Sequence, residues 1–151
     1  MLLRRAFLAG STIWAAAIPL AAFAASRPSA PAAVYGFALT VYAVGRIVCH
    51  QLPARSFHVW GMSLPVCARC TGIYVGAAAT AVLLRGSRLR VRANRFGGRF
   101  EPRLVLLAAL APTGATLIFE WTMGVTPANW VRALAGVPLG AAVAWAIGMV
   151  N

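Results

Sequence analysis

The chain has few charged side chains. Only 11% of its 151 residues are charged, lysine and aspartate are absent, and the acidic residues are Glu101 and Glu120 alone. A soluble globular domain typically carries about 25% charged residues. Because 61% of this sequence is hydrophobic, too little polar surface remains to cover a water-facing fold. The composition therefore excludes an ordinary soluble domain and predicts an integral membrane protein.

The shortage of acidic residues leaves the arginines largely uncompensated, with 14 of them giving a formal net charge of +12. A basic excess can indicate nucleic-acid binding, but that function needs a basic face on a soluble scaffold. Seven arginines instead share one loop between apolar segments: Arg85, Arg88, Arg90, Arg92, Arg95, Arg99 and Arg103. This grouping indicates that the arginines set the membrane topology and contact anionic lipid. We expect a lipid bilayer as partner, no nucleic acid, and a place in a bacterial inner (plasma) membrane.

Long apolar runs set the fold. Five of them are long enough, or nearly so, to cross ~30 Å of hydrocarbon as helices. They cover residues 6–25, 33–48, 66–84, 104–123 and 130–150. The sequence therefore predicts an all-α, multi-pass transmembrane bundle of about five spans, in a single domain over residues 1–151. Segment 6–25 follows Arg4 and Arg5 and also resembles an export signal or anchor; we expect an uncleaved first helix.

Small residues recur at four-residue spacing in two of the predicted spans. The third span has Gly72, Gly76 and Thr80, and the last span has Gly136, Gly140, Ala144 and Gly148. Such stripes let two membrane helices approach closely. We interpret them as ordinary packing surfaces of the bundle.

Span parity brings distant residues to one face of the membrane. The end of the second span, the start of the third, the end of the fourth and the start of the fifth must lie together. This face carries Cys49, His50, Cys67, Cys70, Glu120, Asn129 and Arg132. The basic loop (residues 85–103) favours an extracytoplasmic location for it, against the weaker signal of Arg4 and Arg5.

All three cysteines belong to this set, and three cysteines cannot all pair within one chain. Cys67 and Cys70 open a predicted helix, share one side of it, and meet the positive end of its dipole, which favours thiolate. Cys49 adds a third sulfur, and His50 or His58 can add a nitrogen. Three thiolates and one imidazole make a tetrahedral site of the kind that zinc prefers.

Other interpretations of the cysteines remain open. A Cys-x-x-Cys pair at a membrane boundary can also exchange thiols for a disulfide, with Cys67 attacking and Cys70 resolving. Buried cysteines are often simply small apolar residues. A standard c-type haem attachment is excluded, because Thr71 follows Cys70 where histidine is required. A small transporter is a further alternative, with Glu120 as the intramembrane carrier group.

Charged residues can support a metal site at this face. Arg55, Arg69 and Arg132 can offset the net negative charge of three thiolates around a dication, or pair with Glu120. An ionisable group within a span usually faces a partner in the bundle interior. We therefore predict that Glu120 pairs with Arg132 or Arg55.

The cysteine-containing stretches carry a family resemblance. Cys-His-Gln at 49–51, Arg-Ser-Phe at 55–57 and Cys-x-Arg-Cys-x-Gly-x-Tyr-x-Gly at 67–76 resemble a domain-of-unknown-function family of small predicted membrane proteins. The similarity extends through Asn129, Arg132 and the glycines of the last span. It implies that the two cysteine-containing pieces act as one unit, and that His50 rather than His58 is the fourth ligand.

These observations lead to one leading hypothesis. The chain is a small integral membrane protein with a zinc-type site of structural or regulatory purpose, and zinc or a similar divalent metal is the expected cofactor. The predicted ligands are Cys49, His50, Cys67 and Cys70. The predicted supporting residues are Arg55, Arg69, Glu120, Asn129 and Arg132. No catalytic nucleophile or general base stands out, so the sequence favours a binding protein over an enzyme, with a membrane thiol oxidoreductase as the alternative.

Overall fold

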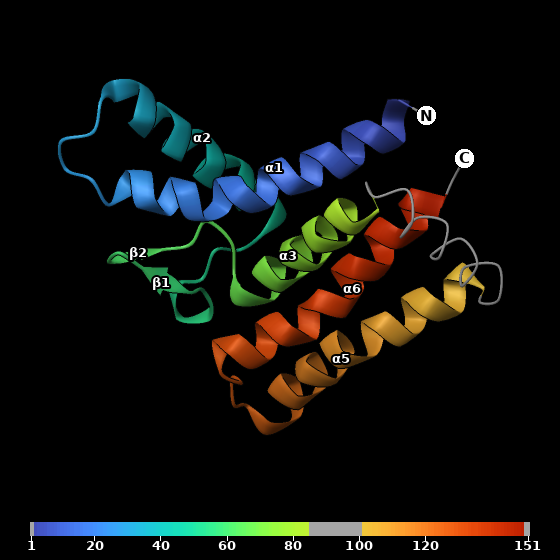
Figure 1. The fold of residues 1–151 in the computed structure, drawn as a ribbon. Helices are drawn as coiled ribbons and strands as arrows, with labels where there is room; N and C mark the ends of the chain where they lie inside the picture. Colours follow the sequence, from blue (N-terminus) through green and yellow to red (C-terminus); the bar gives the residue numbers. More distant parts are fainter. Residues whose placement is uncertain (1, 85–100, 150–151) are drawn as a thin grey trace.

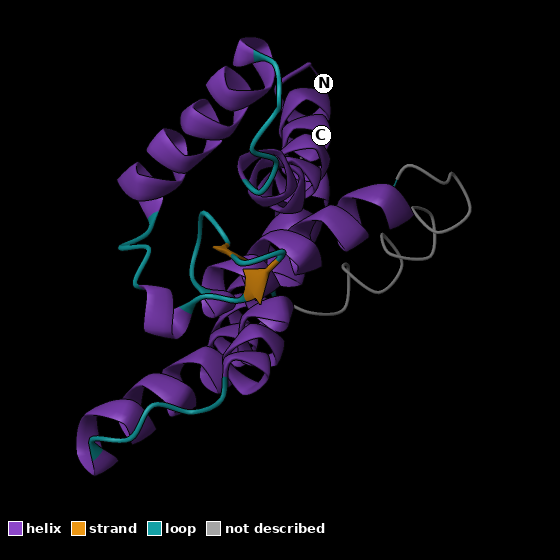
Figure 2. Ribbon diagram, turned by 90° about the vertical axis from the view of Figure 1, so that its left-hand side faces the viewer, coloured by secondary structure: helices purple, strands orange, loops and turns teal. Residues whose placement is uncertain are grey.

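Helices make up most of the structure. The computed structural model describes residues 2–84 and 101–149, and short loops join α1 to α2 and α5 to α6 (Figure 2). The described helices are α1 (Leu2–Ala25), α2 (Ala32–Val48), α3 (Ala68–Leu83), α5 (Pro102–Met123) and α6 (Asn129–Met149). The prediction of an all-α fold is confirmed (Figure 1).

Three of the described helices are long and apolar enough to cross a membrane, over Arg5–Ala25, Pro102–Met123 and Asn129–Gly148. Helices α2 and α3 are apolar but shorter. At 1.5 Å per residue the 16 residues of α3 extend about 24 Å, less than the ~30 Å of a hydrocarbon core. The bundle thus combines three full-length helices with two shorter ones.

The predicted segments match the helices closely. Most boundaries agree to within two residues, while α1 begins at Leu2 instead of residue 6. Pro19, Pro112 and Pro138 lie inside unbroken helices, as membrane helices allow when neighbours cover the freed carbonyls. Six of the seven loop arginines, all but Arg103, lie outside the described residues, so the membrane orientation stays a prediction.

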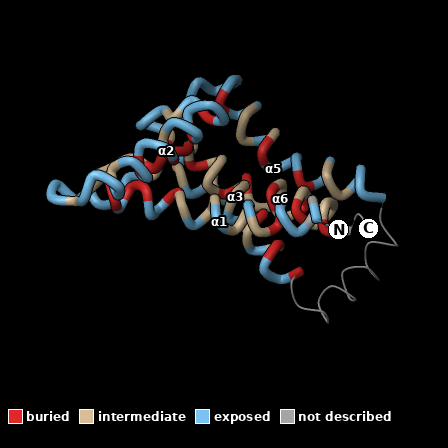
Figure 3. Tube along the Cα trace, turned by 90° about the horizontal axis from the view of Figure 1, so that it is seen from above, coloured by how far each residue is buried: buried red, intermediate tan, exposed pale blue. Residues whose placement is uncertain are grey.

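The centre of the bundle is the contact between α3 and α6. A Cβ atom added at Gly72 would overlap the carbonyl of Ala133, and one at Gly140 would overlap the carbonyl of Ile73. The two backbones therefore touch directly, as the small-residue stripes predict. Buried residues gather along these two helices, whereas most of α2 and α5 is exposed (Figure 3).

The other helices pack around this pair. On one side α5 lies along α6, and the Thr113 hydroxyl donates a 2.8 Å hydrogen bond to the carbonyl of Ala135. On the other side α1 crosses α3, where the rings of Trp14 and Tyr74 meet edge to face with centroids 6.0 Å apart. Helix α2 packs against α1. Its buried residues are Ala38, Val41 and Gly45.

The segment between α2 and α3 is more ordered than the sequence suggests. It forms a short 3-10 turn (Pro53–Arg55) and a small antiparallel hairpin of β1 (His58–Val59) and β2 (Met62–Ser63). The residues at the turn, Trp60 and Gly61, both have positive φ, 52° and 77°, as a tight two-residue hairpin turn requires. The hairpin shortens the connection and returns the chain to the start of α3.

Candidate metal centre

Helix α2 ends just before the first cysteine. Cys49 has extended backbone angles, φ −149° and ψ 140°, although its N–H still donates to the carbonyl of Gly45 at 2.9 Å. Gln51 then takes a left-handed conformation with φ 49°. The chain therefore turns sharply away from the helix axis. This ending frees Cys49 and His50 from helical spacing, so that both can face one cavity.

Gln51 joins the end of α2 to the segment before α3. Its side-chain amide donates to the carbonyl of Tyr42 at 2.8 Å and to the carbonyl of Pro65 at 2.6 Å. A Cβ atom added at Gly45 would overlap the same Pro65 carbonyl, so the two segments pack backbone to backbone. Gln51 was not predicted to have a role, although its place in the Cys-His-Gln motif was a signal for one.

The connection brings the second cysteine-containing segment against the first. Cys67 precedes α3 as its N-cap residue, with φ −66° and ψ 161°. Its N–H donates to the sulfur of Cys49 at 3.1 Å. Cys70 lies in the first turn of α3, and the three Sγ atoms all lie within 4.8 Å of one another. We call these three residues the sulfur cluster.

The sulfur cluster lies between an apolar wall and a cavity that several polar side chains reach. Cys49 is buried against Ile18 and Ala22 of α1 and Val66 of the loop. On the other side is a cavity of about 190 Å³, lined by all three cysteines, His50, Gln51, Leu52, Val48, Arg55, Arg69 and Arg132. A small ion can therefore reach the cluster from the cavity, while α1 covers Cys49 on the other side.

The two histidines differ in their relation to this cavity. His50 is exposed and lines the cavity beside the sulfurs. Among the described residues, however, the group of mutually close ligand atoms consists of the three sulfurs, without His50. His58 is exposed on β1 and is not among the residues that line the cavity. His50 thus remains the histidine better placed to approach the sulfurs.

The surroundings of Cys67 favour its thiolate. Cys67 is the N-cap residue at the N-terminus of α3, where unpaired N–H groups lie, and Arg132 lines the same cavity. Hydrogen bonds and positive charge both stabilise the anionic form of a thiol. An anionic sulfur is the form that binds a metal ion.

Next to the sulfur cluster, arginines from three segments surround a single carboxylate. Glu120 is 6% exposed. Its Oε1 lies 2.8 Å from Arg69 Nη2 and 3.0 Å from Arg132 Nε, and its Oε2 lies 3.7 Å from Arg55 Nη1. The sequence offers all three arginines as partners and favours Arg132 or Arg55; Arg69 pairs with Glu120 as well. We call these four residues the arginine–glutamate cluster.

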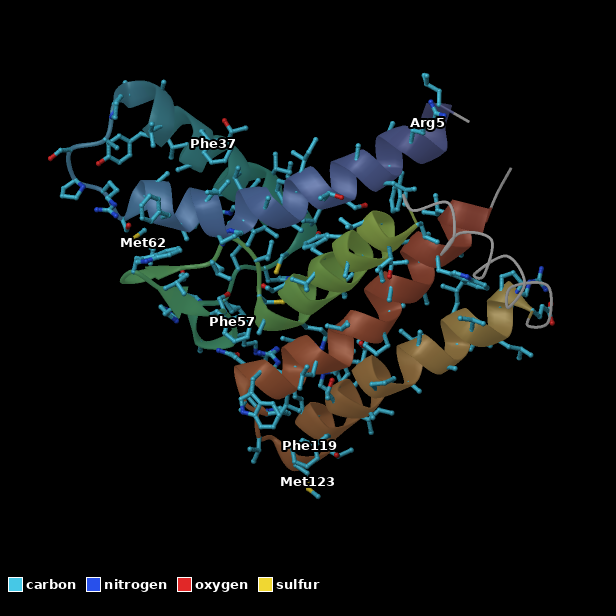
Figure 4. The ribbon with its side chains drawn as sticks, in the orientation of Figure 1. Arg5, Phe37, Phe57, Met62, Phe119 and Met123 are labelled. Atoms are coloured by element: carbon cyan, nitrogen blue, oxygen red, sulfur yellow. The ribbon has the colours of Figure 1, made fainter. Side chains whose placement is uncertain are left out.

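This cluster joins the two halves of the site. Arg55 and Arg69 come from the segment that carries the cysteines, whereas Glu120 ends α5 and Arg132 begins α6. Phe119 and Met123, its neighbours on α5, point away from the bundle (Figure 4). Asn129 adds a further link, since its side-chain amide donates to the carbonyl of buried Ser56 at 3.0 Å. The end of α2, the start of α3, the end of α5 and the start of α6, which span parity places at one face of the membrane, do meet at this site.

The whole site lies inside a region that matches a known family. The family model described as "Predicted membrane protein (DUF2085)" matches residues 49–146. The chain belongs to the DUF2085 family. The matched region begins at Cys49 and includes Cys67, Cys70 and the arginine–glutamate cluster, while α1 lies before it. The family resemblance predicted from the cysteine motifs is confirmed, and it describes a membrane protein without stating an activity.

Two relatives share shorter stretches with the chain. An uncharacterized protein of Methanocaldococcus jannaschii is 44% identical over 45 residues, which is 30% of this chain and 29% of the relative. An uncharacterized protein of Methanothermobacter thermautotrophicus is 56% identical over 32 residues, 21% of this chain and 29% of the relative. The matched part of the chain thus spans under a third of each relative's length. No solved structure matches the chain.

Proposed function

We propose that this DUF2085 protein binds one soft divalent metal ion, with zinc the best candidate, through Cys49, Cys67 and Cys70. The observation that carries the proposal is the approach of the three Sγ atoms to within 4.8 Å of one another. They come from two segments that are 18 residues apart in sequence and are held together by Gln51. Unrelated buried cysteines have no reason to converge in this way.

The spacing of the sulfurs suits a tetrahedral ion. Zinc–sulfur bonds of about 2.3 Å at tetrahedral angles place two ligand sulfurs about 3.8 Å apart. Sulfurs that lie within 4.8 Å of one another need to move by about 1 Å at most to reach that spacing. Rotation about the Cα–Cβ bonds of the cysteines is enough for such a movement.

Charge also supports this proposal. Three thiolates around a dication carry a net charge of −1, which is costly to place beside hydrocarbon. The arginine–glutamate cluster, with three arginines and one carboxylate, contributes a charge of +2 at the wall of the same cavity. We infer that its excess positive charge stabilises the anionic sulfurs.

We propose His50 as the fourth protein ligand. It lines the cavity beside the sulfurs, and the extended chain after α2 lets its side chain swing without disturbing a helix. A bound ion would then fix the C-terminal end of α2 to the start of α3. Because α2 is mostly exposed, this link would make the position of α2 depend on the metal. A structural or regulatory role in the plasma membrane follows.

The experiment compares metal content with thiol protection. Protein purified in detergent without chelators is assayed for metals by mass spectrometry, and its thiols are counted with an alkylating reagent before and after chelation. We expect about one zinc ion per chain and three thiols that react only after chelation. His50→Ala should weaken retention of the metal, whereas His58→Ala is the matched control. A metal-free protein with a Cys67–Cys70 disulfide would instead favour the thiol oxidoreductase.

A further inference from the structure

The cavity beside the sulfur cluster is also a basic pocket. Its volume is about 190 Å³, which corresponds to roughly six water molecules at ~30 Å³ each. An ion of five heavy atoms, such as phosphate, fits this space. Sulfurs line one part of the cavity, and Arg55, Arg69 and Arg132 line another. The pocket therefore offers positive charge to a small ligand that enters beside the sulfurs.

The positive charge exceeds what the proposed metal site neutralises. The arginine–glutamate cluster carries +2, and three thiolates with a dication carry −1. The metal-loaded site is thus left with a net charge of +1 around a small cavity. Excess charge in a partly buried site is compensated most directly by an ion of the opposite sign. This charge balance calls for one further negative charge.

Buried donors in the arginines point the same way. Arg132 is 1% exposed, and its Nη1 is buried without a hydrogen-bond acceptor among the described residues. The Nε of Arg69 is likewise buried and without an acceptor among them. The Nε of Arg132 also makes no hydrogen bond of good geometry, although it lies 3.0 Å from Glu120 Oε1 and forms an ion pair with it. Buried N–H groups usually have acceptors, and guanidinium groups bind oxyanions well.

We propose that the cavity binds a small oxyanion, of the size of phosphate or a simple carboxylate, between Arg132, Arg69 and Arg55 and beside the sulfur cluster. This inference deepens the proposed function, because the anion would occupy the same cavity as the metal ion. Arg132 is the main binding residue, and Arg55, with a side chain that is 42% exposed, contributes less. The anion would lie beside the metal ion in this cavity without replacing any of its four proposed protein ligands.

Cobalt(II) spectroscopy tests both sites on the full-length protein in detergent. Cobalt bound by thiolates gives visible absorption that changes with its surroundings. We expect titration with inorganic phosphate to change this spectrum in a saturable manner. Arg132→Gln should weaken the apparent phosphate affinity at least ~10-fold, since it removes charged donors. Arg46→Gln, at an exposed arginine of α2 that does not line the cavity, should leave it unchanged.

A second variant covers the case in which Arg132→Gln does not fold. Arg55→Gln changes a partly exposed side chain, so folding should be retained, and we expect a loss of a few-fold in phosphate affinity. The proposal would be overturned if the spectrum saturates with cobalt but responds neither to phosphate nor to short-chain phosphatidylglycerol, which serves as the lipid probe. Equal phosphate affinities in Arg55→Gln, Arg46→Gln and the unchanged protein would do so too.

Two further measurements distinguish a free anion from a lipid headgroup, and the anion proposal from the metal proposal. Phosphate binding to lipid-depleted protein indicates a free anion, whereas a response only to short-chain phosphatidylglycerol indicates a lipid headgroup; both support an oxyanion site. Calorimetric titration of metal-free protein with phosphate measures the anion site independently of the metal. If cobalt does not bind but phosphate does, the metal proposal fails and the anion proposal stands. If cobalt binds and neither anion source does, only the anion proposal fails.

Discussion

Replacing Gln51 with alanine tests whether this side chain organises the sulfur cluster. The change removes two hydrogen bonds, to the carbonyls of Tyr42 and Pro65. At about 1 kcal/mol net for each bond, about 2 kcal/mol of the energy holding the two segments together is lost. Alanine meets the same left-handed backbone conformation as Gln51, so the comparison isolates the side chain. If binding metal requires the two segments to be joined, affinity should fall roughly 30-fold.

The assay is competition for zinc with a chromophoric chelator in detergent, alongside thermal unfolding. Thr122→Ala is the control, because it removes an exposed hydroxyl that bonds to the carbonyl of Ile118 on α5. This control should change zinc affinity by less than about twofold, as its hydrogen bond lies outside the site. An unchanged zinc affinity in Gln51→Ala, with a protein that remains folded, would refute the reasoning.

Three further predictions concern the bundle. Gly140→Ala should lower the free energy of unfolding in detergent by about 1–3 kcal/mol, because the added methyl overlaps the Ile73 carbonyl. In the same assay Gly114→Ala, with open space around it, should be neutral or stabilising. Equal effects of the two substitutions would contradict direct contact between α3 and α6. Glu120→Ala should destabilise the folded protein by about 3–5 kcal/mol, since it leaves buried arginines unpaired. The same assay should show little effect for Glu101→Ala, which changes an exposed residue. A small effect of Glu120→Ala would argue against the ion-pair network. A reporter fused to the C-terminus should be found in the cytoplasm if residues 85–103 face the cytoplasm, because two spans separate that loop from the C-terminus, and a signal from outside the cytoplasm would reverse the predicted orientation.

The sequence predicts the helices well because membrane helices are set by length and hydropathy. The ends of α2 and α5 agree with the predicted segments at residues 48 and 123, where apolar runs give way to polar residues or glycine. The hairpin was not predicted. Its strands have two residues each, too few for an alternating pattern, and Trp60–Gly61 is not a usual turn sequence.

The meeting of distant residues at one face was predictable, but the details of their contacts were not. Parity alone places Cys49 near Cys67 and Glu120 near Arg132. It does not give the rotation of each helix about its axis, which decides that Arg69 reaches Glu120 at 2.8 Å. The role of Gln51 depends on a positive φ and on the path of a loop, and neither follows from hydropathy.

X-ray absorption spectroscopy at the zinc edge, on protein purified without added metal, tests the central claim most directly. Three sulfur neighbours at about 2.3 Å and one lighter neighbour at about 2.0–2.1 Å are expected, with Cys70→Ser reducing the sulfur count to two. A coordination sphere without sulfur, or a protein that holds no metal while its cysteines remain reduced, would contradict the account.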